Sequence, residues 1–301
     1  MQRGSIPSGL EGERADKIVA QLAGVSRSAA RALFESDPGV LVDGRRVAAN
    51  ERLAGGVVAF SAPESTETVA PEIVPFEVIY EDNDLIVIDK PPGIVVHPGA
   101  GQSRGTLVAG LLERYPELEG VGQSDRWGLV HRLDKETSGL LLVARTPESY
   151  KRLVADLAAR RIHRRYLALV HGAMEMATGT IDAPIGRDPS HPTRKRVTSD
   201  GRPARTHYRL LRTVDDLSLL ELTLETGRTH QIRVHLAAIE HPVVGDRTYS
   251  RQQSAIPLRR MFLHAAKLDL VHPTTQESHS FESPLPDELA DFLRRLGSFP
   301  I

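Results

Sequence analysis

WGLVHRLDKETSGLLLVAR, residues 127–145, joins a charged loop to an apolar strand. Residues 140–144 are an unbroken apolar run of strand length, which predicts a strand in the core. Residues 131–136 are densely charged, and residues 137–139, TSG, supply turn chemistry. A charged loop that leads into a buried strand can hold a reactive side chain rigidly, so the stretch predicts a functional site. Charge pattern alone is equally compatible with a solvated loop in front of a core strand.

Composition limits the classes of protein to which the chain can belong. Its 301 residues are enough for two domains, and 40% hydrophobic with 26% charged residues is typical of globular proteins. No apolar run approaches the roughly 18 residues of a membrane span, and the first residues lack the apolar segment of a secretory signal. The absence of cysteine excludes disulfides, thiol catalysis and cysteine-ligated zinc. We therefore expect a cytoplasmic protein that contacts no membrane, and a monomer by default.

The rest of the chain predicts more strands than helices. Strands are expected at residues 76–80, 85–89, 162–170, 180–185, 204–211, 219–225 and 261–271. Helices are expected at residues 106–115, 147–160, 230–239 (capped by Thr229 and ended by the sequence HPVVGD) and 286–296. Because strands and helices do not alternate regularly, the pattern favours an α+β fold with a mixed, largely antiparallel sheet.

The first part of the chain predicts a separate unit. Residues 13–60 contain helical patterns at 15–22 and 27–34, the second capped by Ser26, and a hairpin that turns at Asp43-Gly44. Residues 61–74, SAPESTETVAPEIV, are polar, acidic and proline-bearing, which is typical of a linker. We expect a small α/β module at 13–60, a mobile linker at 61–74 and the main domain at 75–301.

Three motifs carry a resemblance to a known family. They are HRLDKETSGLLLVAR (131–145), RYLALVHG (165–172) and ETGRTHQIRVH (225–235). In order and approximate spacing they resemble the RluA family of pseudouridine synthases, over about residues 76–296. The resemblance implies the pseudouridine synthase fold with a central cleft across its sheet. It also implies an isomerase that detaches uracil from its ribose, turns it and rejoins it through carbon, with no cofactor and no metal.

The resemblance also assigns the site. It implies that Asp134 is the catalytic residue, that Tyr166 faces the pocket, and that Arg233 is the cationic partner of Asp134. A guanidinium always stays charged and would keep an enclosed carboxylate ionised. Tyr166 can stack on uracil or take part in proton transfer, although a tyrosine in a strand is usually only packed.

Further residues are expected to bind the substrate. The resemblance associates Arg132, two residues before the catalytic aspartate, with the flipping of the target base, and Arg228 and His230 belong to the third motif. The formal net charge of −1 means that any positive surface for RNA is local. Positive charge gathers in two basic stretches, residues 152–165 and 194–205, and residues 194–196 of the second are expected in a polar loop between the strands at 180–185 and 204–211.

The first module resembles the RNA-binding domain named after ribosomal protein S four, through RADKIVAQL, SRSAARAL and VLVDGRRV. This resemblance implies structured RNA as the partner, most often large-subunit ribosomal RNA, with transfer RNA as the alternative. The residues expected to contact RNA are Arg14, Lys17, Arg27, Arg31, Arg164 and Arg165.

Other functions compete for the same residues. Asp134 with Glu136 would suit a glycoside hydrolase. His230 and His235 could suggest a metal site, but a spacing of five places them poorly on one helical face, so packing is the better interpretation. The glycines at 55–56 and 99–101 do not form a phosphate loop. A non-catalytic RNA-binding or ribosome-assembly protein also stays open, because it would keep both domains and the basic stretches.

Overall fold

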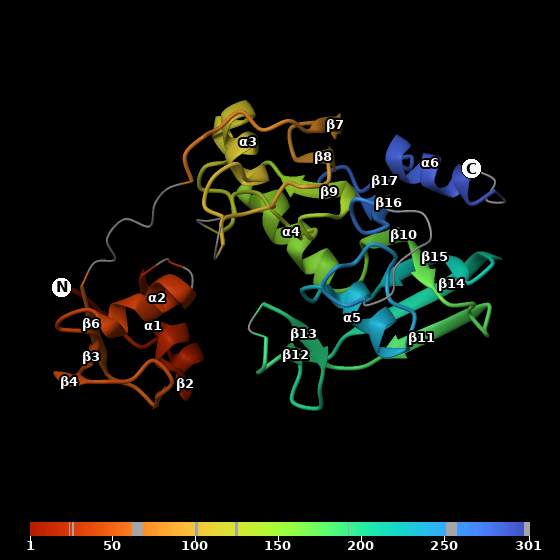
Figure 1. The fold of residues 1–301 in the computed structure, drawn as a ribbon. Helices are drawn as coiled ribbons and strands as arrows, with labels where there is room; N and C mark the ends of the chain where they lie inside the picture. Colours follow the sequence, from red (N-terminus) through yellow and green to blue (C-terminus); the bar gives the residue numbers. More distant parts are fainter. Residues whose placement is uncertain are drawn as a thin grey trace.

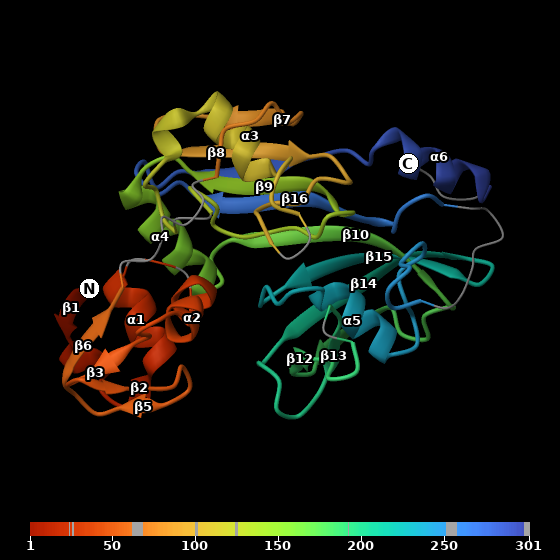
Figure 2. The same cartoon turned by 60° about the vertical axis from the view of Figure 1, so that its left-hand side comes forward.

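Strand β9 (Ser138–Ala144) lies inside the large sheet and is buried along its whole length, as its apolar run predicts. The computed structural model describes residues 1–23, 25, 27–61, 69–99, 102–123, 126–191, 193–250 and 258–297, and only the backbone of residues 27–29. Its large sheet has nine described strands, and Figure 2 shows most of them side by side. In spatial order they are β11 (Thr178–Asp182), β14 (Arg205–Val214), β15 (Leu217–Leu224), β10 (His163–His171), β16 (Leu263–Val271), β9, β8 (Leu85–Lys90) and β7 (Glu77–Glu81), with β17 (Ser278–Glu282) paired to β16.

The sheet is antiparallel between its described strands except where β9 meets β16. This parallel contact is short and joins Ser138 to His264 and Gly139 to Ala265. Gly139 has φ +110°, and a Cβ there would lie 2.3 Å from the carbonyl oxygen of Ala265. Glycine is therefore required where the charged loop enters the sheet.

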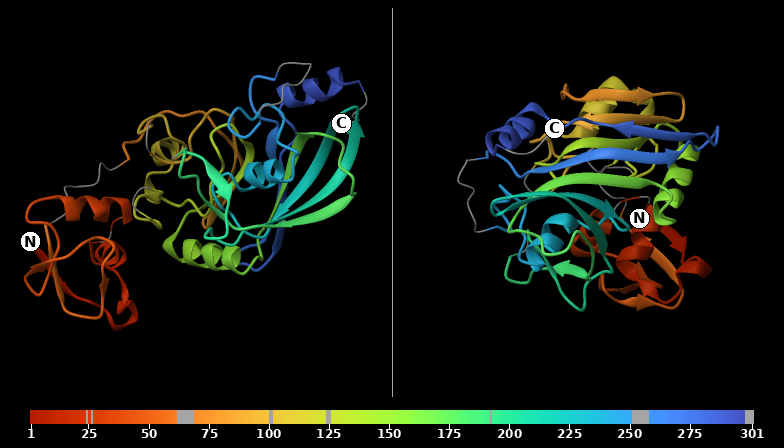
Figure 3. Two further views of the ribbon diagram at one scale, coloured as in Figure 1. Left: turned by 60° about the horizontal axis from the view of Figure 1, so that its bottom comes forward. Right: turned by 90° about the vertical axis from the view of Figure 1, so that its right-hand side faces the viewer.

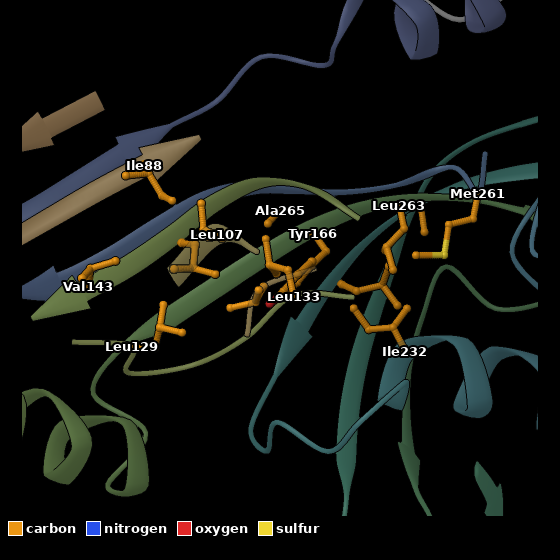
Figure 4. Close-up of a cluster of buried hydrophobic side chains, with 14 of the residues drawn as sticks. Ile88, Leu107, Leu129, Leu133, Val143, Tyr166, Ile232, Met261, Leu263 and Ala265 are labelled. Atoms are coloured by element: carbon orange, nitrogen blue, oxygen red, sulfur yellow. The ribbon is translucent and has the colours of Figure 1, made fainter. Parts of the chain in front are cut away.

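The helices pack on the sheet through apolar faces. Thr106 caps α3 (Leu107–Arg114), and Thr146 with Ser149 forms a capping box at the start of α4 (Pro147–Ala158). The core that contains Leu107 also contains Ile232 of α5 (Gln231–Ala238), and Figure 4 shows both among the buried side chains around Tyr166. Figure 3 shows α4 and α6 (Asp287–Arg295) at different ends of the sheet. No helix of the described residues is long and apolar enough to span a membrane.

The α+β architecture with a mixed, largely antiparallel sheet is confirmed, but three local predictions are wrong. Thr229 does not cap α5: the helix begins after His230, which has φ +59° and makes no capping bond. The predicted strand at 180–185 is two strands, β11 and β12 (Ile185–Arg187). The loop holding the second basic stretch contains β13 (Lys195–Val197), paired to β12, and its basic composition concealed the strand.

The residues before 61 form a separate unit, drawn in red and orange in Figure 1. This unit has a hydrophobic core of its own, from Ile6 to Phe60. Helices α1 (Ala15–Ala23) and α2 (Arg27–Glu35) accompany a sheet of β1, β6, β3 and β4. Its strands are β1 (Gln2–Ser5), β6 (Val57–Phe60), β3 (Leu41–Val42) and β4 (Arg45–Arg46), and β2 (Glu13–Arg14) pairs with β5 (Arg52–Leu53). Because β1 pairs with β6, the unit starts before the predicted residue 13. The predicted cap Ser26 lies outside the described residues.

The predicted linker is longer than the structure allows. Residues 62–68 lie outside the described part of the chain, but Val69 already packs against the main core. The amide of Glu72 donates to the carbonyl of Ala109 (3.1 Å), and its carboxylate accepts from the amide of Gly105 (2.8 Å). Residues 69–74 are therefore attached to α3 and its N-terminal loop.

We predict that acidification destabilises the fold before most carboxylates titrate. Burial lowers the pKa of His131 to about 3, and also lowers the pKa of His235 and His264. Below a pH of about 6.5, the ordinary pKa of histidine, these residues bind protons in the unfolded chain more readily than in the folded protein. The free energy of unfolding therefore falls as the pH falls. Between pH 7.5 and 5.5 the free energy of unfolding should fall by about 1 kcal/mol through His131, and further through His235 and His264. Urea unfolding at both pH values measures it, and an equal or higher stability at pH 5.5 would refute it.

Candidate active site

The loop that carries Asp134 is held from beneath by a buried lysine. Lys90, at the end of β8, is fully buried, and its ammonium donates to the carbonyls of Pro91 (2.7 Å), Ile94 (3.1 Å) and Lys135 (3.1 Å). Burial lowers the pKa of Lys90 to about 7. The lysine thus ties the residue next to Asp134 to the turn that follows β8.

A second buried cation holds the other side of the loop. Arg260 donates from Nη1 to the carbonyl of Glu136 (3.1 Å) and from Nη2 to Oγ of Ser138 (3.1 Å). The same hydroxyl lies 2.9 Å from Nδ1 of His264, whose Nε2 lies 3.0 Å from the carbonyl of Ser283. The end of the charged loop that enters β9 is therefore fixed to β16 and its flanks.

Asp134 forms an ion pair with Arg233. Nη1 of Arg233 donates to Oδ2 of Asp134 (3.0 Å), and its Nε and Nη2 donate to the two carboxylate oxygens of Asp246 (2.6 and 3.0 Å). These two carboxylates raise the pKa of the guanidinium further, against its burial. The ring of Tyr249 lies 5.0 Å below the guanidinium. Arg233 is thus a fixed cation between two anions.

The start of α5 places Arg233 at this point. His230 takes the left-handed conformation and turns the chain into the helix, and its Nδ1 lies 2.8 Å from the hydroxyl of Tyr249. The side chain of Gln231 accepts from the hydroxyl of Thr226 (2.7 Å) and the amide of Arg228 (3.0 Å). It therefore organises the loop before the helix, and Arg233 follows in the first turn.

A cavity of about 640 Å³ opens above the ion pair. Tyr166 lines it from β10 with only 4% of its surface exposed, and burial raises the pKa of its hydroxyl. The exposed Arg132 lies with Nη1 2.9 Å from Nε2 of His97. The cavity brings together seven of the predicted residues: Arg132, Asp134, Arg164, Tyr166, Arg228, His230 and Arg233.

Other predicted RNA-binding residues lie elsewhere and are paired. Arg165 does not line the cavity, and it pairs with Asp269 (2.9 Å). In the N-terminal unit, Arg14 and Arg31 both pair with the buried Asp16 (3.0 and 3.3 Å), and Lys17 pairs with Glu13 (2.6 Å). The side chain of Arg27 lies outside the described residues.

The competing sites do not assemble around the cavity. Among the described residues, Glu136 is not part of its lining, so the carboxylate pair of Asp134 and Glu136 that a glycoside hydrolase would use does not face the cavity. His235 lies against the hydroxyl of Thr206 and the carbonyl of Ala183 (both 2.9 Å), which fits the packing interpretation.

One group of possible metal ligands lies elsewhere. It consists of Asp82, Asp84 and His272, whose ligand atoms lie within 4.8 Å of one another. The carboxylate of Asp82 already accepts from the hydroxyl of Tyr80, from two backbone amides and from His272. Hydrogen bonding within the protein accounts for this cluster.

Sequence reasoning missed Asp246 and Lys90. The sequence HPVVGD indicates only the end of a helix. The carboxylate of Asp246, with none of its side chain exposed, also accepts from the amides of Thr248 (2.8 Å) and Tyr249 (3.2 Å). The available signal was an aspartate directly after an apolar run and a glycine. Lys90 carried a similar signal, because it closes the apolar strand β8 before two prolines.

The fold and the cavity define an enzyme-like site, in which an ion-paired carboxylate, that of Asp134, faces a cavity lined by six arginines. A family model described as RNA pseudouridylate synthase matches residues 84–238. The chain is 43% identical over 307 residues to the ribosomal large subunit pseudouridine synthase D of Nitrosomonas europaea, an alignment that covers 98% of this chain and 88% of that protein. It is 50% identical over 295 residues to an uncharacterized RNA pseudouridine synthase of Chloroflexus aurantiacus, with 97% and 92% covered.

A solved structure gives the same result. The human protein RNA Pseudouridylate Synthase Domain Containing 4 matches with a TM-score of 0.59 and 25% identity, over 73% of this chain and 92% of that one. The chain therefore belongs to the RNA pseudouridylate synthase family and is an RNA pseudouridine synthase, an isomerase. The resemblance carried by the three sequence motifs is confirmed.

We predict that Arg233→Ala abolishes turnover and destabilises the fold. The change leaves two carboxylates facing each other, one of them fully buried, and breaking a buried pair costs about 3–5 kcal/mol. Urea unfolding and an assay for pseudouridine measure both effects. Arg209→Ala is the control, because Arg209 pairs with Glu221 on the surface and should change stability by less than about 1 kcal/mol. A stable, fully active Arg233→Ala enzyme would remove the functional role of the pair.

Proposed function

We propose that this protein isomerises uridines in large-subunit ribosomal RNA. The supporting observation is that relatives about 40% identical over nearly the whole chain, from Nitrosomonas europaea and Xanthomonas campestris, are named ribosomal large subunit pseudouridine synthase D. The cavity agrees with an RNA substrate, because six arginines line it. They are Arg126, Arg132, Arg160, Arg164, Arg228 and Arg233. Ribosomal RNA as substrate agrees with a cytoplasmic enzyme.

Asp134 is the proposed catalytic residue. The reaction breaks the bond between uracil nitrogen and the anomeric carbon of ribose and forms a bond between that carbon and a ring carbon. The proton on that ring carbon leaves, and the freed nitrogen takes up a proton, so no redox partner is needed. The balance holds whether the carboxylate adds to the sugar, adds to the base or takes a sugar proton.

Arg233 is proposed to keep that carboxylate ionised when the substrate displaces water. Enclosure favours the neutral acid, and a guanidinium at 3.0 Å opposes this effect. Tyr166 lines the same cavity from β10, where its ring can support the turning uracil and its hydroxyl can take part in removing the proton from carbon. Arg228 and His230 complete the wall toward the substrate.

Arg132 is proposed to assist base flipping. A uridine in structured RNA must leave its stack before the carboxylate can reach it, which costs a few kcal/mol. Arg132 is exposed at the cavity, next to His97, and its planar guanidinium can fill the vacated position in the stack.

The N-terminal unit is proposed to act as an RNA-binding domain of the kind named after ribosomal protein S four. Two helices and a hairpin in the expected order support this proposal. The cations Arg14 and Arg31 share one carboxylate, that of Asp16, and so keep a surplus of positive charge. Such a unit would determine which region of the RNA is bound, whereas the residues of the cavity would catalyse the isomerisation.

We predict that Asp134→Asn abolishes pseudouridine formation but keeps RNA binding. Asparagine has nearly the same shape and can still accept a hydrogen bond from Arg233, but it lacks the ionised carboxylate. Pseudouridine mapping in total RNA from cells that carry wild-type or variant protein identifies the modified uridines, and filter binding measures affinity. Modification only in transfer RNA would refute the ribosomal assignment, and an active variant would refute the role of Asp134.

We predict that Arg132→Ala harms structured RNA more than flexible RNA. The expected loss of kcat/KM is about 10-fold or more on a folded stem-loop and smaller on an unpaired strand, because only the stem-loop requires unstacking. Single-turnover assays on both RNAs give the ratio. An equal loss on both substrates would contradict a role in flipping.

A further inference from the structure

Arg164 lies in the same cavity as the proposed catalytic residues but has no assigned task in the chemistry. It stands two residues before Tyr166 on β10, and alternation along a strand places both side chains on the same face of the sheet. Only 6% of Arg164 is exposed, and it lines the cavity. Its charge helps to lower the pKa of the neighbouring His131.

The guanidinium of Arg164 has no hydrogen-bond or ion-pair partner within the described residues, and its Nε is buried and unpaired. Neighbouring arginines differ in this respect, because Arg165 pairs with Asp269 and Arg160 pairs with Glu225. A buried charge without a counter-ion is costly, so the arrangement requires an anion in the complete assembly.

The lining of the cavity does not supply that anion. Its carboxylates, among the described residues, are Asp134 and Glu225. Asp134 pairs with Arg233, and Glu225 pairs with Arg160, Arg205 and His207. The counter-ion of Arg164 must therefore come from the ligand.

The shape of the cavity indicates which part of the ligand this is. Its volume of about 640 Å³ exceeds what a uracil ring alone requires, and it extends from Asp134 to the apolar side of α4 formed by Val154 and Leu157. On the opposite side the chain passes close to Arg164 at a glycine: a Cβ on Gly227 would lie 3.2 Å from Nη1. The cavity that Arg164 lines therefore has room for sugar and backbone beside the base.

We propose that Arg164 binds a phosphate that flanks the flipped-out uridine, and so anchors the target nucleotide rather than the RNA in general. A guanidinium fits phosphate in two-point geometry, with charge-assisted hydrogen bonds. The inference rests on the proposed function, because it takes RNA as the ligand. It adds a subsite inside the cavity that is separate from the ion pair of Asp134 and Arg233.

The test combines Arg164→Gln with neutral linkages in the substrate. A short uridine-containing RNA is prepared with normal phosphates, or with a methylphosphonate directly 5′ or 3′ of the target uridine. On the normal RNA, Arg164→Gln should lower affinity and kcat/KM by about 10- to 100-fold. One of the neutral linkages should lower the wild-type values by a similar factor and leave Arg164→Gln without further loss.

Two variants separate binding from folding. Arg209→Gln removes an equal charge from an exposed arginine that pairs with Glu221 outside both basic stretches, and should cost less than about 2-fold. Arg164→Lys keeps the charge and should retain more affinity than Arg164→Gln on normal RNA. The comparison of the three RNAs with wild-type protein uses no variant, so a folding defect cannot affect it. Wild-type protein that is indifferent to both neutral linkages, or a penalty from Arg164→Gln that is the same on all three RNAs, would overturn the proposal.

Affinity is measured alongside turnover so that the two hypotheses can fail separately. Wild-type protein that binds RNA without forming pseudouridine would refute the proposed function. In that case, loss of the methylphosphonate effect in Arg164→Gln would still support the phosphate subsite. Normal turnover with additive effects of Arg164→Gln and methylphosphonate would end the subsite and leave the proposed function intact.

Discussion

The site depends on one cation placed between two carboxylates. Arg233 bonds Asp246 through two nitrogens and Asp134 through the third. The carboxylate of Asp246 is fully enclosed and also accepts from backbone amides, whereas 14% of the Asp134 side chain is exposed at the cavity. The two acids are therefore not equivalent: Asp246 orients the guanidinium, and Asp134 keeps free lone pairs. Such a preset charge needs little reorganisation when a substrate arrives.

The surrounding fold fixes the backbone around this pair with further buried cations. Lys90 and Arg260 donate to carbonyls of the loop residues Lys135 and Glu136, so the chain beyond Asp134 cannot shift without leaving two buried side chains short of hydrogen-bond partners. The loop enters the sheet at Gly139, where the short parallel contact between β9 and β16 brings the strands too close for a side chain. The contacts that stabilise this loop are therefore the same contacts that position Asp134.

Apolar periodicity predicted the main strands and helices because burial gives a strong local signal, as in β9. The motifs led to Asp134, Tyr166 and Arg233 because they lie in recognisable runs. The partner Asp246 could not be predicted, since its importance comes from a contact thirteen positions from Arg233 that no periodicity encodes. The same limit hid β13, whose pairing outweighs its basic composition.

The distribution of paired and unpaired arginines explains how a chain of net charge −1 can accept RNA. Outside the cavity, cations such as Arg161 and Arg209 have carboxylate partners, which reduces their long-range field. Inside it, Arg164 has no partner in the part of the chain that the structure describes, and Arg132 contacts a histidine. Positive potential is therefore concentrated in a concave space, where it acts more strongly than on a flat surface. Local charge, rather than total charge, makes the cavity suited to a polyanion.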